Sequence, residues 1–346
     1  MSIKLRLGVV GLGMGRGHAE GYKSHPGAEL VALCDLDENR LRSAAKQLKV
    51  GQIYTDLKSM LEQGDLDAVS IAVPNKLHAP LTIQALGAGL HVLCEKPMAT
   101  NVKEAEGMQR AAAEAGKSLM INFSFRFTET SHMLKQQVDS GAIGDIYFGR
   151  SMWHRYRGMP GNWFADREIA GGGPLIDLGV HRLDLALWLM GYPEPVAVSG
   201  STYDYIAREE QVGWGDTYTV EDLACGLIKF ANGATLLLEA SWALNIKERE
   251  LMVTTLYGTR GNVEQRNVDG GYQFTGEVLS AENGNIFTKT LARRTAPTPS
   301  AYHEFVDSIL ENRPPLATGE EGVKVMKILE GIYKSAATGC EVRYKK

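Results

Sequence analysis

LRLGVVGLGMGRGH, residues 5–18, is the stretch that decides the fold of the N-terminal part of the chain. Its apolar run is expected to form a buried strand, and a helix is expected to begin at about His18. Gly11 and Gly13 between them are typical of a turn whose backbone approaches a dinucleotide pyrophosphate at a helix N-terminus. The third glycine of the usual spacing falls on Arg16, so the fingerprint is irregular and is a weak indication by itself. Arg16 could contact a phosphate or point to solvent.

An acidic residue follows the next predicted strand, which covers residues 29–35. At this distance from the glycine turn, Asp35 would hydrogen-bond the ribose hydroxyls and repel a 2′-phosphate, which favours NAD over NADP. The alternative is that Asp35 caps the following helix, 38–48. NADP is not excluded, because Arg40 lies close enough to accommodate a 2′-phosphate.

The alternation of strands and helices then continues to residue 122 and predicts a parallel, doubly wound sheet, the Rossmann arrangement of an α/β fold. Ligands of such sheets bind beyond the carboxyl ends of the strands. Several polar or conformationally restricted residues are expected at those ends, namely Pro74, Asn75, His78, Glu95, Lys96 and Pro97. The further strands are predicted at 52–54, 67–73, 91–97 and 118–123, with helices from 56, at 81–89 and at 102–116.

The pattern changes at residue 123, so we predict a nucleotide-binding domain over 1–122 and a second, α+β domain over 123–346. Asn232-Gly233 is a strong hairpin signal between two strand-like runs, and successive hairpins predict a large, mostly antiparallel open sheet. Its apolar positions could face a partner subunit or the helices of its own domain. Strands are expected at 145–157, 195–205, 217–230, 234–244, 249–258, 261–268 and 285–292, and helices at 128–141, 301–312 and 320–339.

GGGPLIDLGVHRLD, residues 171–184, is the clearest candidate for chemistry. Three successive glycines allow backbone to lie close to another group, and a helix is expected to begin near Pro174. Asp177, His181 and Asp184 are spaced by four and three, which predicts one helical face. A carboxylate one turn from an imidazole can orient the ring for general acid/base work. The alternatives are a satisfied polar pair on a buried helix and, less favoured, a metal site, because neither a cysteine nor a second histidine stands at ligand spacing.

Composition excludes several classes of function. The length of 346 residues suggests about two domains, and a net charge of −4 leaves no nucleic-acid footprint. Four widely spaced cysteines, Cys34, Cys94, Cys225 and Cys340, favour reduced thiols over a disulfide framework and hence the cytoplasm. The N-terminus leads directly into a strand without an apolar signal core, and an apolar stretch of membrane-spanning length is missing, so we expect neither secretion nor a membrane partner.

The glycine turn, Glu95-Lys96-Pro97 and GGGxxxDxGxHxxD at 171–184, in this order, resemble the glucose–fructose oxidoreductase, inositol dehydrogenase and MocA family over nearly the whole chain. The resemblance implies an NAD(H)-dependent oxidoreductase that interconverts a secondary hydroxyl and a ketone on a sugar, sugar derivative or cyclitol. An NAD-dependent glycoside hydrolase acting by transient oxidation and a non-catalytic NAD-binding sensor are the alternatives. A homodimer or homotetramer formed through the open sheet is also implied.

The resemblance further implies roles for individual residues. Lys96, Asp177 and His181 would be catalytic, with His181 as the acid/base, Asp184 as a supporting residue and a cis peptide at Lys96–Pro97. Cofactor binding would involve Gly11, Leu12, Gly13, Met14, Gly15, Arg16, Asp35, Arg40, Pro74, Asn75, His78, Glu95 and Lys96. Substrate binding would involve Lys96, Arg126, Trp153, His154, Arg157, Trp163, Asp177 and His181.

Overall fold

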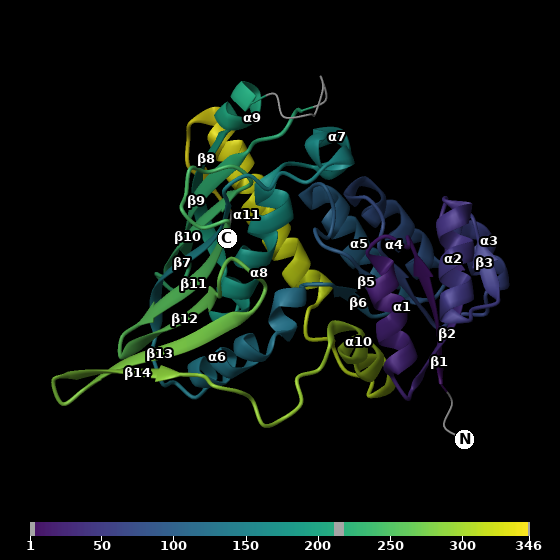
Figure 1. Ribbon diagram of the computed structural model, residues 1–346, viewed down its shortest axis with the longest axis horizontal. Coiled ribbons are helices and arrows are strands. Elements are labelled where there is room, and N and C mark those ends of the chain that lie inside the picture. The colour runs from purple at the N-terminus through teal and green to yellow at the C-terminus, as the bar shows by residue number, and fades with distance from the viewer. Residues whose placement is uncertain (1–3, 211–217, 345–346) are drawn as a thin grey trace. The chain divides into compact units, whose positions relative to one another are not determined.

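The first sheet is built from six parallel strands in the order β3-β2-β1-β4-β5-β6 (Figure 1). The computed structural model describes residues 4–210 and 218–344 of the chain. The strands are β1 (Leu5–Val10), β2 (Ala28–Cys34), β3 (Gln52–Tyr54), β4 (Ala68–Ile71), β5 (His91–Cys94) and β6 (Leu119–Ile121). The connecting helices are α1 (Gly15–Ser24), α2 (Glu38–Leu48), α3 (Leu57–Gln63), the short turn η1 (Asn75–Leu77) with α4 (His78–Gly87), and α5 (Val102–Ala115). The doubly wound sheet predicted from the sequence is confirmed.

The apolar runs of these strands are buried on both faces, as parallel sheets require. Leu7, Val9, Val69, Ile71 and Val92 are completely buried. Continuous apolar runs therefore identified the strands correctly. In the structure Asp37, Asp56 and Asn101 each accept backbone N–H bonds at the start of a helix.

The second sheet has nine strands, ordered β14-β13-β12-β11-β7-β10-β9-β8-β15, and is antiparallel except where β7 pairs with β10. Its strands are β7 (Ile146–Arg155), β8 (Pro195–Tyr203), β9 (Leu223–Phe230), β10 (Thr235–Ser241), β11 (Glu250–Gly258), β12 (Gly261–Asn267), β13 (Phe274–Glu282), β14 (Asn285–Thr290) and β15 (Val342–Arg343). The sequence did not predict β13, and of the strand expected over 217–230, residue 217 lies outside the described residues.

Helices lie along one face of this sheet. In Figure 1, α6 (Glu129–Asp139) and α8 (Val180–Leu189) run beside the strands, and α6 contacts β12 and β13 while α8 contacts β7 and β11. Ile332 of α11 (Gly319–Thr338) packs against Gly200 and Gly226 on β8 and β9. The remaining helical segments are η2 (Ser124–Phe127), η3 (Asn162–Ala165), α7 (Arg167–Ala170), η4 (Leu175–Gly179), α9 (Tyr205–Glu210) and α10 (Ala301–Leu310).

The chain divides into two compact units, one made of residues up to 122 together with 299–326 and the other of 123–298 together with 327 onward. In this division the first unit ends at Asn122, and it also takes the segment 299–326, which the sequence predicted to belong to the second domain. The reason is a set of contacts between residues far apart in the chain: the Ile121 N–H donates to Ala317 O at 3.0 Å, and the ring of Tyr302 lies 4.7 Å from that of His18. Within the described residues, none of the helices has both the length and the apolar character that a membrane span needs.

Candidate functional site

The glycine turn of the first unit brings two backbone segments into close contact. Gly11 has φ +84°, its N–H donates to Cys34 O at 2.8 Å, and a Cβ there would lie 2.2 Å from Ala72 O. Only glycine fits such a position. A Cβ on Gly15 would lie 2.8 Å from the side chain of Val9, because the start of α1 packs closely against β1. The third glycine of the fingerprint is thus Gly15, one position before Arg16, whose guanidinium donates to Gln47.

Asp35 follows β2 and is directed toward the glycine turn. One carboxylate oxygen accepts the Leu12 N–H at 2.7 Å and the other accepts the Asp37 N–H at 2.9 Å, while Arg40 lies 3.4 Å away. The helix cap is Asp37, so the alternative role of Asp35 as the cap is wrong. A carboxylate accepts more bonds than these, and Asp35 therefore retains the capacity to accept ribose hydroxyls beside the turn.

Glu95 lies in a buried hydrogen-bond network beneath Lys96. His18 of α1 contacts its Oε1 through Nε2 at 2.8 Å, Asn122 donates to the same oxygen at 2.7 Å, and the Lys96 N–H donates to Oε2 at 3.1 Å. Burial alone would raise the pKa of Glu95, but the hydrogen bond and charge of His18 outweigh it and lower that pKa to about 2. Glu95 therefore connects the helix after the glycine turn to the backbone of Lys96.

His78 connects the residue after Lys96 to the end of another strand segment. Its ring nitrogens lie 2.7 Å from Pro97 O and 2.8 Å from Val73 O, and the side chain is completely buried. Burial lowers the pKa of His78, against the effect of both carbonyl oxygens. The Lys96–Pro97 peptide is cis, as the family resemblance implied, and Lys96 itself is half-buried. His78 thus positions the strand ends, with Pro74 and the buried Asn75 beside it in the same turn.

In the second unit, a π-helical turn, η4, leads directly into α8 and carries the candidate acid/base residues. Asp177 lies in the π turn and accepts a hydrogen bond from Trp242 Nε1 at 3.1 Å. His181 lies in the first turn of α8, and its ring is 4.9 Å from that of Phe125 and 5.7 Å from that of Trp153. Such π turns are frequent at functional sites.

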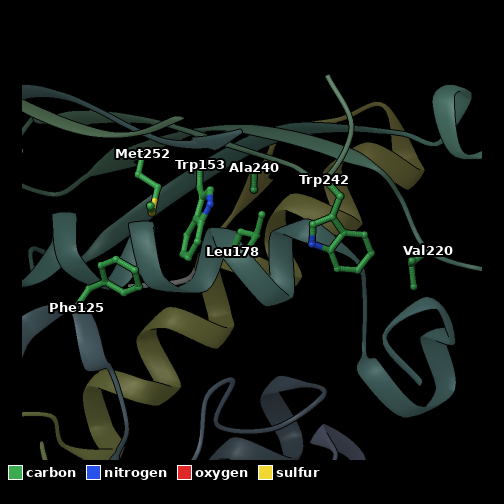
Figure 2. Packing of buried hydrophobic residues seen from close by; sticks show 7 residues of the cluster. All are labelled: Phe125, Trp153, Leu178, Val220, Ala240, Trp242 and Met252. Carbon is green, nitrogen blue, oxygen red and sulfur yellow. The ribbon is translucent and has the colours of Figure 1, made fainter. Parts of the chain in front are cut away.

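An apolar cluster supports this segment from the sheet side. Figure 2 shows Trp153, Ala240 and Met252 directed from the strands toward the helical segment that carries Leu178. Phe125 and Trp242 complete the contacts, and Trp242 is completely buried. Close packing restricts the positions of the aromatic rings in this cluster, so they support the helical segment in a fixed position.

Asp184, which was expected as a supporting residue, has its carboxylate buried against Arg126. Arg126 Nε donates to Oδ2 at 3.0 Å and Nη2 to Oδ1 at 2.6 Å, and the Tyr192 hydroxyl donates to Oδ1 at 2.5 Å. Arg126 is 0% exposed and Asp184 is 1% exposed. We therefore assign both residues to the packing of this unit, since a side chain without accessible surface cannot contact a substrate.

The other predicted substrate residues are dispersed. Trp153 joins the cluster beneath His181, but His154 lies on the opposite face of the sheet, 3.4 Å from Glu239, because successive strand residues alternate between faces. Arg157 connects two loops by donating to Tyr156 O and Asn245 Oδ1, and Trp163 stacks on Phe164 at 4.0 Å. The structure therefore does not bring His154 to His181.

Glu250 is a functional candidate that the sequence did not reveal. It accepts hydrogen bonds from Trp153 Nε1 at 2.6 Å and Arg155 Nε at 2.8 Å. Burial lowers the pKa of the Arg155 guanidinium, but the hydrogen bond and charge of Glu250 and, to a smaller extent, the charge of Asp177 raise it above its usual value. Glu250 begins β11 and Trp242 directly follows β10, both far along the chain, and no spacing pattern marks either of them. Within the described residues, no cluster of three or more potential ligands could hold a metal ion.

Comparison with known proteins gives matches over the whole chain. Residues 5–123 match the model of the oxidoreductase family with an NAD-binding Rossmann fold, and 132–264 match the C-terminal domain of the same family. D-glucoside 3-dehydrogenase of Escherichia coli strain K12 is 32% identical over 99% of this chain and 98% of that protein. Myo-inositol 2-dehydrogenase of Thermotoga maritima is 29% identical over 92% of each chain. The aldose–aldose oxidoreductase of Caulobacter crescentus, a structure with glycerol, has a TM-score of 0.84 and 27% identity, covering 99% of this chain and 100% of that one.

Proposed function

The chain belongs to the glucose–fructose oxidoreductase, inositol dehydrogenase and MocA family of NAD-binding oxidoreductases, and from this premise we propose that it interconverts a secondary hydroxyl and a ketone on a sugar, sugar derivative or cyclitol. The named relatives that act on a glucoside and on myo-inositol support this class of substrate. The observation that carries the proposal is that one chain holds both a glycine turn beside Asp35, in the first unit, and a buried imidazole, His181, in the first turn of α8 after the π-helical turn, in the second unit.

The residues of the first unit fit a bound dinucleotide. The backbone of the turn can approach a pyrophosphate because Gly11 takes a conformation that other residues rarely adopt, and Gly13 has open space where a side chain would stand. Asp35 would accept the ribose hydroxyls and repel a 2′-phosphate, so NAD is the proposed cofactor. Arg40, half-exposed beside Asp35, is the residue through which NADP would be accommodated.

Three side chains are proposed to act on the substrate. His181 takes the hydroxyl proton as general base, and Asp177, itself held by Trp242, stabilises the resulting imidazolium. Lys96 donates a hydrogen bond to the same substrate oxygen and stabilises the negative charge that develops on it. A bound nicotinamide would supply the acceptor for the hydride. In the reverse direction, His181 returns the proton to the ketone oxygen.

Self-association is proposed through the face of the nine-stranded sheet that faces away from α8. Leu227 and Leu237 are register partners there and are only half-buried. An apolar pair on an open sheet is a feature that a second copy of the chain would cover. Light scattering of the purified protein, compared with that of a Leu227→Lys variant, tests whether a homodimer or homotetramer forms through this face.

The test of the function is NADH formation, measured by its near-ultraviolet absorbance, with a panel of inositols, monosaccharides and glucosides. We expect turnover of at least one polyol by the native enzyme and none by His181→Ala, whose NADH affinity should remain that of the native enzyme. His132→Ala, in the same unit, is the matched control and should remain active. A His181→Ala enzyme that turns over normally, or that loses NADH binding, contradicts the assigned role. Cleavage of a glucoside without net NADH formation would identify a hydrolase instead.

A further inference from the structure

The three glycines that precede the π turn are close to groups of the protein itself. Gly171 has φ +84°, a Cβ on Gly172 would lie 2.0 Å from the hydroxyl oxygen of Tyr333, and a Cβ on Gly173 would lie 2.2 Å from the carbonyl oxygen of Glu221. The close approach expected of these glycines is therefore made to Glu221 and Tyr333, two residues that none of the sequence motifs includes.

The Glu221 carboxylate binds the backbone at the start of the helical segment. Its Oε2 accepts the Gly173 N–H at 3.1 Å, and its Oε1 accepts the Leu175 N–H at 3.1 Å and the Tyr333 hydroxyl at 2.7 Å. The residue is 3% exposed. The first N–H groups of a helix have no partner within the helix, and a negative charge there is favoured by the helix dipole. Glu221 thus caps the segment from a distant part of the chain.

The backbone of the same short segment also positions Trp242, the indole that donates to Asp177. Asp222 O accepts the Trp242 N–H at 3.0 Å and the Ser241 hydroxyl at 2.7 Å. A second connection runs through the backbone. The Asp177 N–H donates to Gly173 O at 3.0 Å, and the N–H of the same glycine donates to the Glu221 carboxylate. Two hydrogen-bonded paths therefore run from residues 221–222 to Asp177, one through its backbone and one through its side-chain partner.

We propose that Glu221 is a positioning residue of the enzyme, with Tyr333 as its supporting donor, and that it sets the placement of Asp177 and His181 by fixing the start of the helical segment that carries them. The inference rests on the proposed function. Glu221 acts through the backbone of residues 173–175, and its loss would shift the π turn without removing any group that performs chemistry. A misplacement of about 1 Å at a catalytic group costs on the order of 100-fold in rate.

The test compares Glu221→Gln and Tyr333→Phe with the native enzyme in kcat, KM, NADH affinity and thermal midpoint. The glutamine side chain would place its amide N–H₂ against a backbone donor, so we expect kcat to fall by about 100-fold, and by about tenfold for Tyr333→Phe, which keeps both backbone bonds. KM and NADH affinity should change less than about twofold, because the displaced groups, Asp177 and His181, are proposed to act in the transition state and not in binding the ground state. Tyr333→Phe also keeps the proposal testable if Glu221→Gln does not fold.

Glu304→Gln is the matched control, because Glu304 is a buried glutamate that accepts a backbone N–H, that of Leu316 at 3.0 Å, and belongs to the first unit, whereas η4 belongs to the second. We expect it to lower the thermal midpoint and leave kcat unchanged. Hydrogen exchange of peptides covering 173–189 should quicken in both Glu221→Gln and Tyr333→Phe and not in the control. The positioning role is overturned if folded Glu221→Gln and Tyr333→Phe keep the native kcat while His181→Ala is inactive. If His181→Ala is active, the proposed function is refuted. Hydrogen exchange of the 173–189 peptides then still tests whether Glu221 anchors the start of the helical segment.

Discussion

Replacing Asp184 by asparagine is the sharpest test of how α8 is held. The substitution keeps the shape of the side chain and removes the charge that faces Arg126. The guanidinium is 0% exposed and donates to both oxygens of the carboxylate, from Nε to Oδ2 at 3.0 Å and from Nη2 to Oδ1 at 2.6 Å. Removing one partner of a buried ion pair leaves the other charge without compensation, which costs about 3–5 kcal/mol of the free energy of unfolding. Asp184→Asn should therefore be severely destabilised.

The assay is urea unfolding followed by intrinsic fluorescence. With a slope of about 3 kcal/mol per molar urea, a loss of this size lowers the midpoint by about 1 M or more. The double variant Arg126→Met/Asp184→Asn removes both charges and should recover most of the loss, because a buried pair replaced by neutral groups is often close to neutral in stability. Glu38→Gln, which breaks the exposed Glu38–Arg42 pair, is the control and should leave the midpoint unchanged.

Two outcomes would refute this reasoning. One is a midpoint for Asp184→Asn that equals that of the Glu38→Gln control. The other is a double variant that is less stable than Asp184→Asn, since this would mean that the Arg126 side chain stabilises the unit independently of the carboxylate.

The remaining predictions concern the first unit. Asp35→Ser should raise the ratio of kcat/KM for NADP to kcat/KM for NAD by about tenfold or more, because the carboxylate that repels a 2′-phosphate is gone. An unchanged ratio would show that Asp35 does not discriminate between NAD and NADP. Above pH 4.5, the ordinary pKa of a glutamate side chain, Glu95→Gln should have a smaller free energy of unfolding than the native protein. This difference should shrink as the pH falls toward about 2, the pKa of Glu95 in the folded state, because protonation removes the charge that stabilises the native protein. Urea midpoints at several pH values measure this, and a difference that does not vary with pH would show that the carboxylate is not ionised against His18.

The parts of the site that could be predicted are those encoded by neighbours in the sequence. The glycine turn, Asp35 and Glu95-Lys96-Pro97 follow strands of a parallel sheet, and all strands of such a sheet end at one edge, so their shared location follows from the order of elements. His181 and Asp177 were likewise visible as a spacing of four. Even here the usual spacing fell on Arg16 and left the third glycine unassigned, and only the tertiary structure shows that Gly15 packs closely against Val9.

The amino-acid sequence by itself therefore determined the family, the doubly wound sheet and the residues proposed for chemistry, because local periodicity and motif spacing encode them. The tertiary structure alone decided how those residues are held: Asp184 by Arg126, Asp177 by Trp242, and the glycines of 171–173 by Glu221 and Tyr333. It also joined 299–326 to the first unit. Each of these contacts links residues far apart in the chain, and a side chain's partner across such a distance depends on strand register and burial, which no short stretch of sequence specifies.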